Sequence, residues 1–319
     1  MRTSSTGWFA PTPPSIAIEI ARGRITVVEL GRSSGTAEIA AHATEPLAPE
    51  AVVPSATGVN IATPGLVADA LRQALNRAGI RSATRAALVV PDSVARVSLL
   101  HFDQLPGKAA DLDQLIRWQL KKATPFPIEE AQVTSFTAHT AENGPTLAAV
   151  VARRDIIAQY EAVTSAVGIH AGLVDLASFN VLNAIMGAGA SSPGDWLVVT
   201  MAAEATTLAI MRGRDLMFYR HRLGVDEEPL SALVHQTAMY HEDRLGGTKF
   251  SRVWLCGSSF VTDSAEAARH DIAERLGVPA EAVDIRPAAQ LRDRVTTPIE
   301  VLDALAAPVG VLLRERKAA

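Results

Sequence analysis

Apolar residues alternate with polar ones in two short runs near the start of the chain. The runs Ile16 to Ile20 and Ile25 to Leu30 are joined by the connection Ala21-Arg22-Gly23-Arg24. A period of two is typical of strands, and a short connection that contains glycine joins antiparallel neighbours. The pattern therefore predicts a β-hairpin over residues 16–30, followed by an edge strand and a proline-rich loop that ends near residue 63.

The apolar positions then change from the period of a strand to that of a helix. Thr63 and Pro64 are typical of a helix N-cap and first turn, apolar residues recur at helical spacing up to Ala78, and Gly79 ends the run. The continuously apolar stretch 85–92 predicts a strand that is buried on both faces. The same criteria predict strands over 95–102, 131–137 and 147–152, helices over 112–123 and 156–167, and a strand that turns into a helix over 171–185.

A second series of strands follows the small-residue linker 186–195. Three strand-like runs, 196–201, 206–211 and 216–223, repeat the pattern with which the chain opens. After them the sequence predicts a helix over 229–245, a strand over 252–256, and helices over 264–276 and 298–316. Two halves that each begin with a β-meander and continue with alternating helices and strands indicate an α/β duplication.

This repetition predicts the domain organisation. Residues 1–15 form a flexible arm, and residues 16–94 together with 171–190 form the core of a first lobe. Residues 95–170 form an inserted subdomain of that lobe. Residues 195–319 form a second lobe, whose C-terminal helix can pack back on the first.

Composition and charge narrow the classes of function. Hydrophobic residues make up 48% and charged residues 20%, which is typical of a globular protein. The net charge of −4 gives no case for nucleic-acid binding. A single cysteine, Cys256, excludes an internal disulfide and fits a reducing compartment, and no stretch has the length and apolarity of a membrane span. We expect a cytoplasmic protein that does not insert into the membrane by itself.

Four segments resemble a known family. They are "RAALVVPDSVARVSLLHF" (85–102), "LIRWQLKKATPFPIEEAQVTSF" (115–136), "AAVVARRDIIAQYEAVTSAVGIHAGLVDLASFNVLNA" (148–184) and "LAIMRGRDLMFYRHRLG" (208–224). In content and order they resemble the PilM-type actin-like proteins of type IV pilus assembly, which are related to the cell-division protein FtsA. The resemblance implies an α/β actin-like fold, a ribonuclease H-like duplication with two lobes and a small strand-helix-strand-strand insert in the first.

The resemblance also implies a location and partners. Members of this family lie on the cytoplasmic face of the inner membrane, so the protein is expected to be peripheral to that membrane through a partner. The N-terminal tail of a single-span partner, PilN, tethers the protein in a groove of the first lobe, and further contacts join it to the pilus motor or platform proteins.

The family's nucleotide site depends on motifs that this chain changes. The first phosphate motif, Asp-x-Gly with a following lysine, corresponds here to Glu19, Ala21 and Thr26. The second phosphate motif corresponds to Thr200, Ala202, Glu204 and Thr206. The adenosine motif corresponds to Gly257 and Ser258, which retain one of its two paired glycines. The resemblance therefore places a nucleotide site at these nine positions. Arg22, on the turn of the first hairpin, is the tenth residue of the predicted site.

Physical chemistry argues that this site is degenerate. The Cβ atoms of Ala21 and Ala202 occupy space that glycine leaves open to a phosphate. Thr200 brings no carboxylate for magnesium, and Thr26 brings no positive charge for phosphate. We predict a scaffold with no enzymatic activity and no cofactor.

Two alternatives to this scaffold stay open. Arg22 and Arg24 can in principle bind phosphate, which would make the protein an ATP-binding switch with Mg-ATP in an atypical site, although arginines on such a turn are more often solvated. The other alternative is the cytoplasmic component of a type II secretion platform.

A few other residues are candidates for partner binding, metal binding or reactivity. Trp118 and Phe126 are candidates for lining a peptide groove, but the interpretation favoured for Trp118 is that it packs in the core of the insert. His235 and His241 lack metal-ligand spacing, and a surface or helix-cap role is expected for both. Cys256 is expected to be a buried small hydrophobe.

Overall fold

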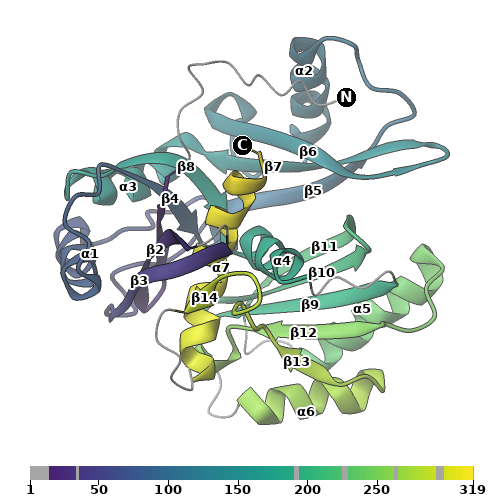
Figure 1. Ribbon diagram of the computed structural model, residues 1–319. Helices are drawn as coiled ribbons and strands as arrows, with labels where there is room; N and C mark the ends of the chain where they lie inside the picture. The colour runs from purple at the N-terminus through teal and green to yellow at the C-terminus, as the bar shows by residue number, and fades with distance from the viewer. Residues whose placement is uncertain are drawn as a thin grey trace.

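The computed structural model describes residues 14–33, 36–189, 194–224, 229–261, 265–291 and 298–318 (Figure 1). Most of the predicted N-terminal arm, and part of the linker around residue 190, lie outside the described residues. The strands are β1 (Ile16–Ala21), β2 (Arg24–Ser33), β3 (Thr36–Pro46), β4 (Arg85–Val90), β5 (Ala95–His101), β6 (Ala131–Ala141), β7 (Gly144–Arg153), β8 (His170–Leu176), β9 (Asp195–Ala202), β10 (Ala205–Arg212), β11 (Asp215–Leu223), β12 (Arg252–Cys256), β13 (Ala280–Ala282) and β14 (Gln290–Leu291). The helices are α1 (Pro64–Ala78), α2 (Ala109–Leu120), α3 (Arg154–Ser165), α4 (Ala177–Gly187), α5 (Leu230–Leu245), α6 (Ala265–Leu276) and α7 (Ile299–Ala318), with single 3₁₀ turns η1 (Asp92–Val94), η2 (Ile128–Glu130) and η3 (Ser258–Phe260).

The first lobe is built on a mixed sheet in the order β14-β3-β2-β1-β4-β8. The predicted hairpin forms its centre, with Glu19 opposite Thr26 and Ala21 opposite Arg24, and β1 lies parallel to β4. Because β4 is covered on both faces, its run from Ala86 to Val90 is entirely buried, as its continuous apolarity predicts. The carboxyl ends of β1 and β4 consequently meet at one edge of the sheet, and this edge faces the second lobe.

The second lobe repeats this plan in the sheet β11-β10-β9-β12-β13. Alternation along β9 separates two buried faces: Leu197 and Val199 pack outward with residues of α5 and α6, whereas Trp196 and Val198 pack inward with the core shared by the two lobes. Figure 1 shows α5 and α6 on the side of this sheet that faces away from the first lobe. Both faces of the sheet are therefore buried.

Helices α4 and α7 lie against each other between the two sheets, and α7 also packs against β1, β2 and β4 (Figure 1). Their close approach depends on glycine, because a Cβ at Gly310 would lie 1.8 Å from the backbone oxygen of Asn180. One continuous apolar cluster includes residues of both sheets together with α4 and α7. The C-terminal helix thus connects the cores of the two lobes.

The insert has its own three-stranded sheet, β5-β7-β6, and its own small apolar cluster with α2. Helix α3 behaves differently, since it packs against α1 and β8 and places Ile156, Tyr160 and Val163 in the shared cluster. Strand β6 also reaches the second lobe, where His139 Nδ1 lies 3.0 Å from the backbone oxygen of Leu216 on β11. The insert therefore contacts both lobes.

Local details differ from the sequence expectations in three places. Helix α2 spans Ala109–Leu120, whereas the sequence predicts a helix over 112–123, so it begins and ends three residues earlier than expected. Thr63 precedes α1 as predicted, but its side chain makes no capping hydrogen bond. Strand β3 is not the edge of its sheet, because the two-residue strand β14 pairs with it. A pairing this short leaves no periodic pattern in the sequence.

Candidate functional site

The candidate site is the cleft where the hairpins β1-β2 and β9-β10 face each other across the carboxyl ends of β4 and β12. A cavity of about 50 Å³ remains in it, whereas small-molecule sites usually enclose roughly 300–1,000 Å³. Seven of the residues predicted from the sequence line this cavity: Glu19, Ala21, Arg22, Thr200, Ala202, Glu204 and Gly257. Three others do not line it: Thr26, Thr206 and Ser258.

Gly257 follows β12 at the bottom of the cleft. Its φ is +80°, and a Cβ at this position would lie 2.1 Å from the backbone oxygen of Met201. Both the left-handed backbone and the close approach of the two strand ends require glycine. This glycine of the adenosine motif therefore has a structural reason to be present that does not involve a ligand.

The first hairpin carries a buried ion pair. Arg24 Nη2 lies 3.2 Å from Glu19 Oε1, and the guanidinium stacks 4.1 Å above the ring centroid of Phe260. Burial raises the pKa of Glu19, and the charge and hydrogen bond of Arg24 oppose that rise. The expectation that arginines of this turn are solvated is wrong for Arg24, because its side chain neutralises a carboxylate that has almost no contact with water.

Asp92, just after β4, lies at the centre of the polar contacts between the lobes. Its Oδ1 accepts hydrogen bonds from the backbone N and the Oγ of Ser178, at 3.1 and 2.9 Å. Its Oδ2 accepts a hydrogen bond of 2.8 Å from Thr207 Oγ1 on β10. Groups of the protein on both sides of the cleft therefore occupy most of the acceptor capacity of this buried carboxylate.

Ser93 extends these contacts to the second hairpin. Its Oγ lies 3.1 Å from Glu204 Oε1 and 3.2 Å from His221 Nε2, and the other ring nitrogen of His221 lies 2.9 Å from Thr207 Oγ1. Burial raises the pKa of Glu204 and lowers that of His221. Both shifts disfavour the charged form of each group.

The floor of the cleft is formed by α7 and the end of β12. Asp303 Oδ2 accepts a 2.6 Å hydrogen bond from Ser259 Oγ, while among the described residues no hydrogen bond reaches its buried Oδ1. Cys256 is a buried free thiol, as predicted, and burial raises its pKa well above the usual range. A protonated thiol in this position acts as a small apolar group rather than as a nucleophile.

Sequence reasoning missed several residues of this cleft and its surroundings: Asp92, Ser93, Ser178, Tyr219, His221 and Asp303. One signal was available for Asp92, because polar residues at the carboxyl end of a buried parallel strand gather at functional edges of α/β sheets. Ser178 lies 86 residues from Asp92 and His221 lies 128 residues from Ser93, and no local pattern points to either contact.

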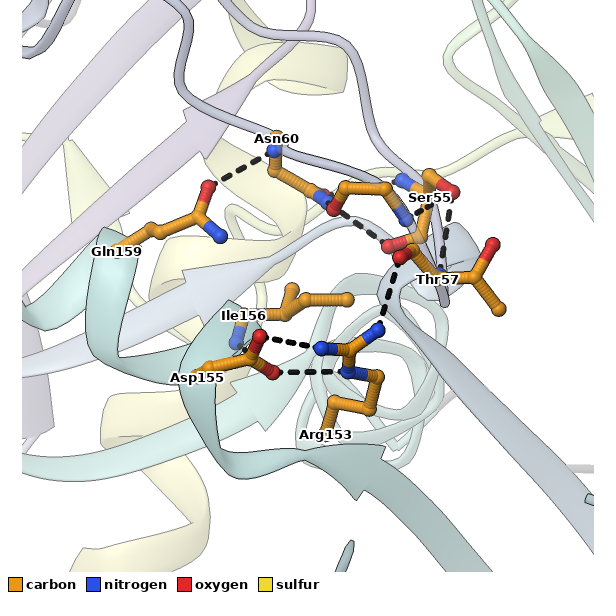
Figure 2. Close-up of polar contacts among 8 residues, drawn as sticks. Ser55, Thr57, Asn60, Arg153, Asp155, Ile156 and Gln159 are labelled. Atoms are coloured by element: carbon orange, nitrogen blue, oxygen red, sulfur yellow. Dashed lines mark hydrogen bonds and ion pairs between the residues drawn. The ribbon is translucent and has the colours of Figure 1, made fainter. Parts of the chain in front are cut away.

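A second feature lies at the junction of the first lobe and the insert. Residues 51–68 contain no charged side chain, and the loop at 51–63 has an ordered shape that depends on Asn60 (Figure 2). The fully buried Asn60 donates from Nδ2 to the backbone oxygens of Ser55 and Gly58, at 2.8 and 2.9 Å, and accepts at Oδ1 from Ser55 N and Tyr160 Oη. One buried side chain thus fixes both ends of the turn.

Helix α3 anchors the same loop from the other side (Figure 2). Gln159 Oε1 accepts the backbone N–H groups of Asn60 and Ile61 at 2.8 and 3.1 Å. Arg153, paired with Asp155, donates to the backbone oxygen of Thr57 at 3.0 Å. We refer to residues 51–66 as the uncharged loop, since they include the loop and the exposed start of α1.

The uncharged loop exposes large apolar side chains in a fixed conformation. Val59 is 71% exposed, Leu66 60% and Val53 45%. Apolar groups that are held outward by a rigid, hydrogen-bonded backbone lose little entropy when a partner covers them. The loop therefore has the properties of a preorganised docking surface.

Two aromatic residues predicted as partner contacts lie elsewhere on the insert. Phe126 is buried in the insert's own cluster. Trp118 is 73% exposed, so the expectation that it packs in that core is wrong. On α2 the buried positions are Ile116 and Leu120, and a residue two positions from either lies on the opposite face of the helix.

His241 is buried rather than exposed, which corrects the surface or cap role expected for it. Its Nε2 lies 2.6 Å from Asp195 Oδ2, and its ring stacks on Phe250 at 4.3 Å between centroids. Gly247 leaves the space that this ring occupies, because a Cβ there would lie 1.9 Å from Nε2. The histidine joins α5 to the start of β9.

Comparison with protein families gives a match over most of the chain. Residues 17–227 match the family model described as type IV pilus assembly protein PilM. No helix in the part of the chain that the structure describes combines the length and the apolarity needed to cross a membrane.

Comparison with solved structures shows the fold. A chain of the PilM-PilN type IV pilus biogenesis complex is similar with a TM-score of 0.80 and 17% identity, over 96% of this chain and 99% of that one. Two further similar structures each have a TM-score of 0.49. One is the cytoplasmic domain of EpsL, an inner membrane component of the type II secretion system of Vibrio cholerae (10% identity, 95% and 94% coverage). The other is a Bacteroides thetaiotaomicron protein of actin-like ATPase fold and unknown function (8% identity, 86% and 91% coverage). The similarity at a TM-score of 0.80, together with the family match, shows the two-lobed actin-like fold that the sequence predicts.

Proposed function

Because this chain belongs to the type IV pilus assembly protein PilM family, we propose that it is a scaffold of a pilus assembly platform that works without nucleotide. In this proposal it lies on the cytoplasmic side of the inner membrane and binds the N-terminal tail of a PilN-like membrane protein. Pilus motor or platform proteins bind its remaining surface. The observation that carries the proposal is the exposed, preorganised uncharged loop. The cleft between the lobes, which the protein's own side chains fill, supports it.

The uncharged loop supports tail binding at the junction of the first lobe and the insert. Its exposed apolar side chains suit an apolar peptide, and no charge within residues 51–68 would have to be desolvated when the peptide binds. The anchoring bonds from Gln159 and Arg153 keep the loop in one conformation before binding. We place the tail against Val59 and the neighbouring start of α1.

The cleft does not fit Mg-ATP well. The second phosphate turn carries Ala202 in place of glycine, Asp92 already accepts three hydrogen bonds from the protein, and the cavity measures about 50 Å³. Among the ten positions of the predicted site, Arg22 is the one cationic side chain. These features support the proposal that the polar groups of the cleft bind one another rather than a nucleotide.

Calorimetric titration with the N-terminal peptide of a PilN-like protein tests the scaffold proposal. We expect binding to the wild-type protein, and an affinity at least ~10-fold weaker for Val59→Asp, because a charge would replace an apolar contact. Leu223→Asp is the matched control, since Leu223 is equally apolar and 61% exposed but lies on the second lobe. Absence of wild-type binding at high micromolar peptide would contradict the proposal.

Titration with Mg-ATP tests the alternative of an atypical nucleotide switch. The proposal expects no heat of binding at micromolar nucleotide. Micromolar binding that Arg22→Ala abolishes would instead assign the cleft to ATP and overturn the proposal that the cleft works without nucleotide.

A further inference from the structure

The polar contacts across the cleft form one chain of groups from the first lobe to the second and back. Asp92 accepts from Thr207 Oγ1, Thr207 Oγ1 contacts His221 Nδ1, His221 Nε2 contacts Ser93 Oγ, and Ser93 Oγ contacts Glu204 Oε1. Asp92 and Ser93 belong to the first lobe, and the other three residues belong to the second. Each contact between the two sets is a direct bond between the lobes.

The hydrogens available to this chain can be counted. Thr207 gives its single hydroxyl hydrogen to Asp92, so the contact with His221 requires a hydrogen on Nδ1. Ser93 has one hydroxyl hydrogen and two acceptor neighbours, Glu204 Oε1 and His221 Nε2. If Ser93 donates to the carboxylate, Nε2 must carry a proton. If Ser93 donates to Nε2, the Glu204 carboxyl must carry one.

We propose that this cleft binds one proton, shared between His221 and Glu204, and that the proton completes the hydrogen bonds that hold the two lobes closed. With a neutral imidazole and an ionised carboxylate the chain lacks one hydrogen, so one of its contacts is lost. While Nδ1 keeps its hydrogen for Thr207, the lost contact is one of Ser93 between the lobes; when Nε2 carries the hydrogen instead, it is the contact of Thr207 with His221. The inference rests on the proposed function, in which the cleft closes on its own side chains rather than on a nucleotide.

Charged groups on every side of the chain bear on where the proton binds. Asp92 on η1 favours a positive His221 and a neutral Glu204, whereas Arg22 on the first hairpin favours an ionised Glu204. Tyr219 and Tyr160 are neutral phenols. Burial lowers the pKa of His221 and raises that of Glu204. Because both groups contact the one hydroxyl of Ser93, they titrate as a pair rather than as separate sites.

The variant that separates this idea from simple packing is Glu204→Gln. A glutamine amide supplies the missing hydrogen at every pH, since its Nε2 donates to Ser93 Oγ and leaves the Ser93 hydrogen for His221. Spin labels at Gln73→Cys on α1 and Glu242→Cys on α5, both exposed, report the distance between the lobes by pulsed electron resonance. Measurements at pH 5 and pH 8 without nucleotide compare the two protonation states.

For the wild-type protein we expect the ratio of open to closed lobes to be about tenfold higher at pH 8 than at pH 5, the change that corresponds to one hydrogen bond. Glu204→Gln should be closed at both pH values. Glu142→Gln, an exposed glutamate on the turn between β6 and β7, is the matched control and should keep the wild-type pH dependence.

Ser93→Ala provides a second route, because it removes the group that links His221 to Glu204 and should abolish the pH dependence without a new charge. Wild-type lobes that do not respond to pH, or a Glu204→Gln protein that responds like wild type, would overturn the inference. Binding of Mg-ATP would contradict the nucleotide-free scaffold but would leave these nucleotide-free distances interpretable.

Discussion

The two hairpins that face each other across the cleft have the same backbone plan but different chemistry. In the first, Glu19 lies opposite Thr26 and Ala21 opposite Arg24. In the second, Thr200 lies opposite Thr207 and Ala202 opposite Ala205. Each hairpin turns through two residues, Arg22-Gly23 and Ala203-Glu204. The positions along the paired strands therefore correspond one to one.

The first hairpin satisfies its charge within its own lobe, and the second reaches across to the other lobe. Glu19 is neutralised by Arg24, which lies on the same hairpin. Thr207 and Glu204 find their partners, Asp92 and Ser93, on the opposite lobe. One hairpin thus keeps a local ion pair, whereas its repeat holds the lobes together. Equivalent positions of a duplicated fold can therefore take separate structural roles once neither has to bind a ligand.

Of the substitutions that test this comparison, removal of the ion pair should lower the free energy of unfolding most. Arg24→Met keeps the apolar contact with Phe260 but leaves Glu19 buried without a counter-charge. We expect the free energy of unfolding at pH 7 to fall by about 3–5 kcal/mol, the loss that follows removal of one partner of a buried pair. Urea denaturation of the wild type and the variant measures it.

The loss of stability in Arg24→Met should depend on pH in a definite direction. Without Arg24 the pKa of Glu19, already raised by burial, rises further, so the native state binds a proton more tightly than the unfolded chain does. The loss of stability in Arg24→Met should be fully present above the pKa of Glu19 in the native state, and it should shrink as the pH falls through that pKa. The double variant Glu19→Gln with Arg24→Met removes the charge and should recover most of the loss. A variant as stable as wild type at pH 7 would show that Glu19 carries no charge in the native protein.

Loss of a contact between the lobes in the second hairpin should have an intermediate effect. Thr207→Val preserves shape but removes the donor to Asp92, and we expect a loss of about 1.5–3 kcal/mol, as for a hydrogen bond to a charged group. Thr206→Val is the matched control, because Thr206 is equally buried and lies on the other face of β10. Equal losses in thermal or urea unfolding would mean that the hydroxyl of Thr207 contributes nothing specific.

The strands and helices of both lobes followed from periodicity. Alternation predicted both hairpins, and the glycine after α1 ends that helix with a φ of +74°, as its sequence position predicts. Strands β13 and β14 escaped prediction because they have three and two residues and exist only through pairing with distant strands. Helical phase also argues against a buried Trp118, since the apolar positions of α2 lie on the opposite face.

The cleft was harder to predict than the fold. The family resemblance directed attention to the turns of both hairpins, but the residues that bridge the lobes follow from three-dimensional proximity. Thr207 lies 115 residues from Asp92, and only the packing of the two sheets around α4 and α7 brings them together. The same holds for Asn60, which contacts Gln159 and Tyr160 about one hundred residues away. Local patterns encode elements, whereas long-range hydrogen bonds depend on the assembled sheets.

The smallest expected effect on stability comes from removal of the charge by which the first hairpin acts on the second. Arg22 of the first turn lies close enough to lower the pKa of Glu204 in the second, against the larger effect of burial, which raises it. Arg22→Ala should therefore change the free energy of unfolding by less than about 0.5 kcal/mol, as for most surface substitutions. It should also move proton uptake by the pair of His221 and Glu204 to a higher pH. Carboxyl and imidazole resonances followed by NMR measure that midpoint, and Arg244→Ala on α5 should leave it unchanged. A midpoint that stays fixed or falls in Arg22→Ala would mean that the two hairpins do not interact through charge, and that bonds between the lobes alone connect them.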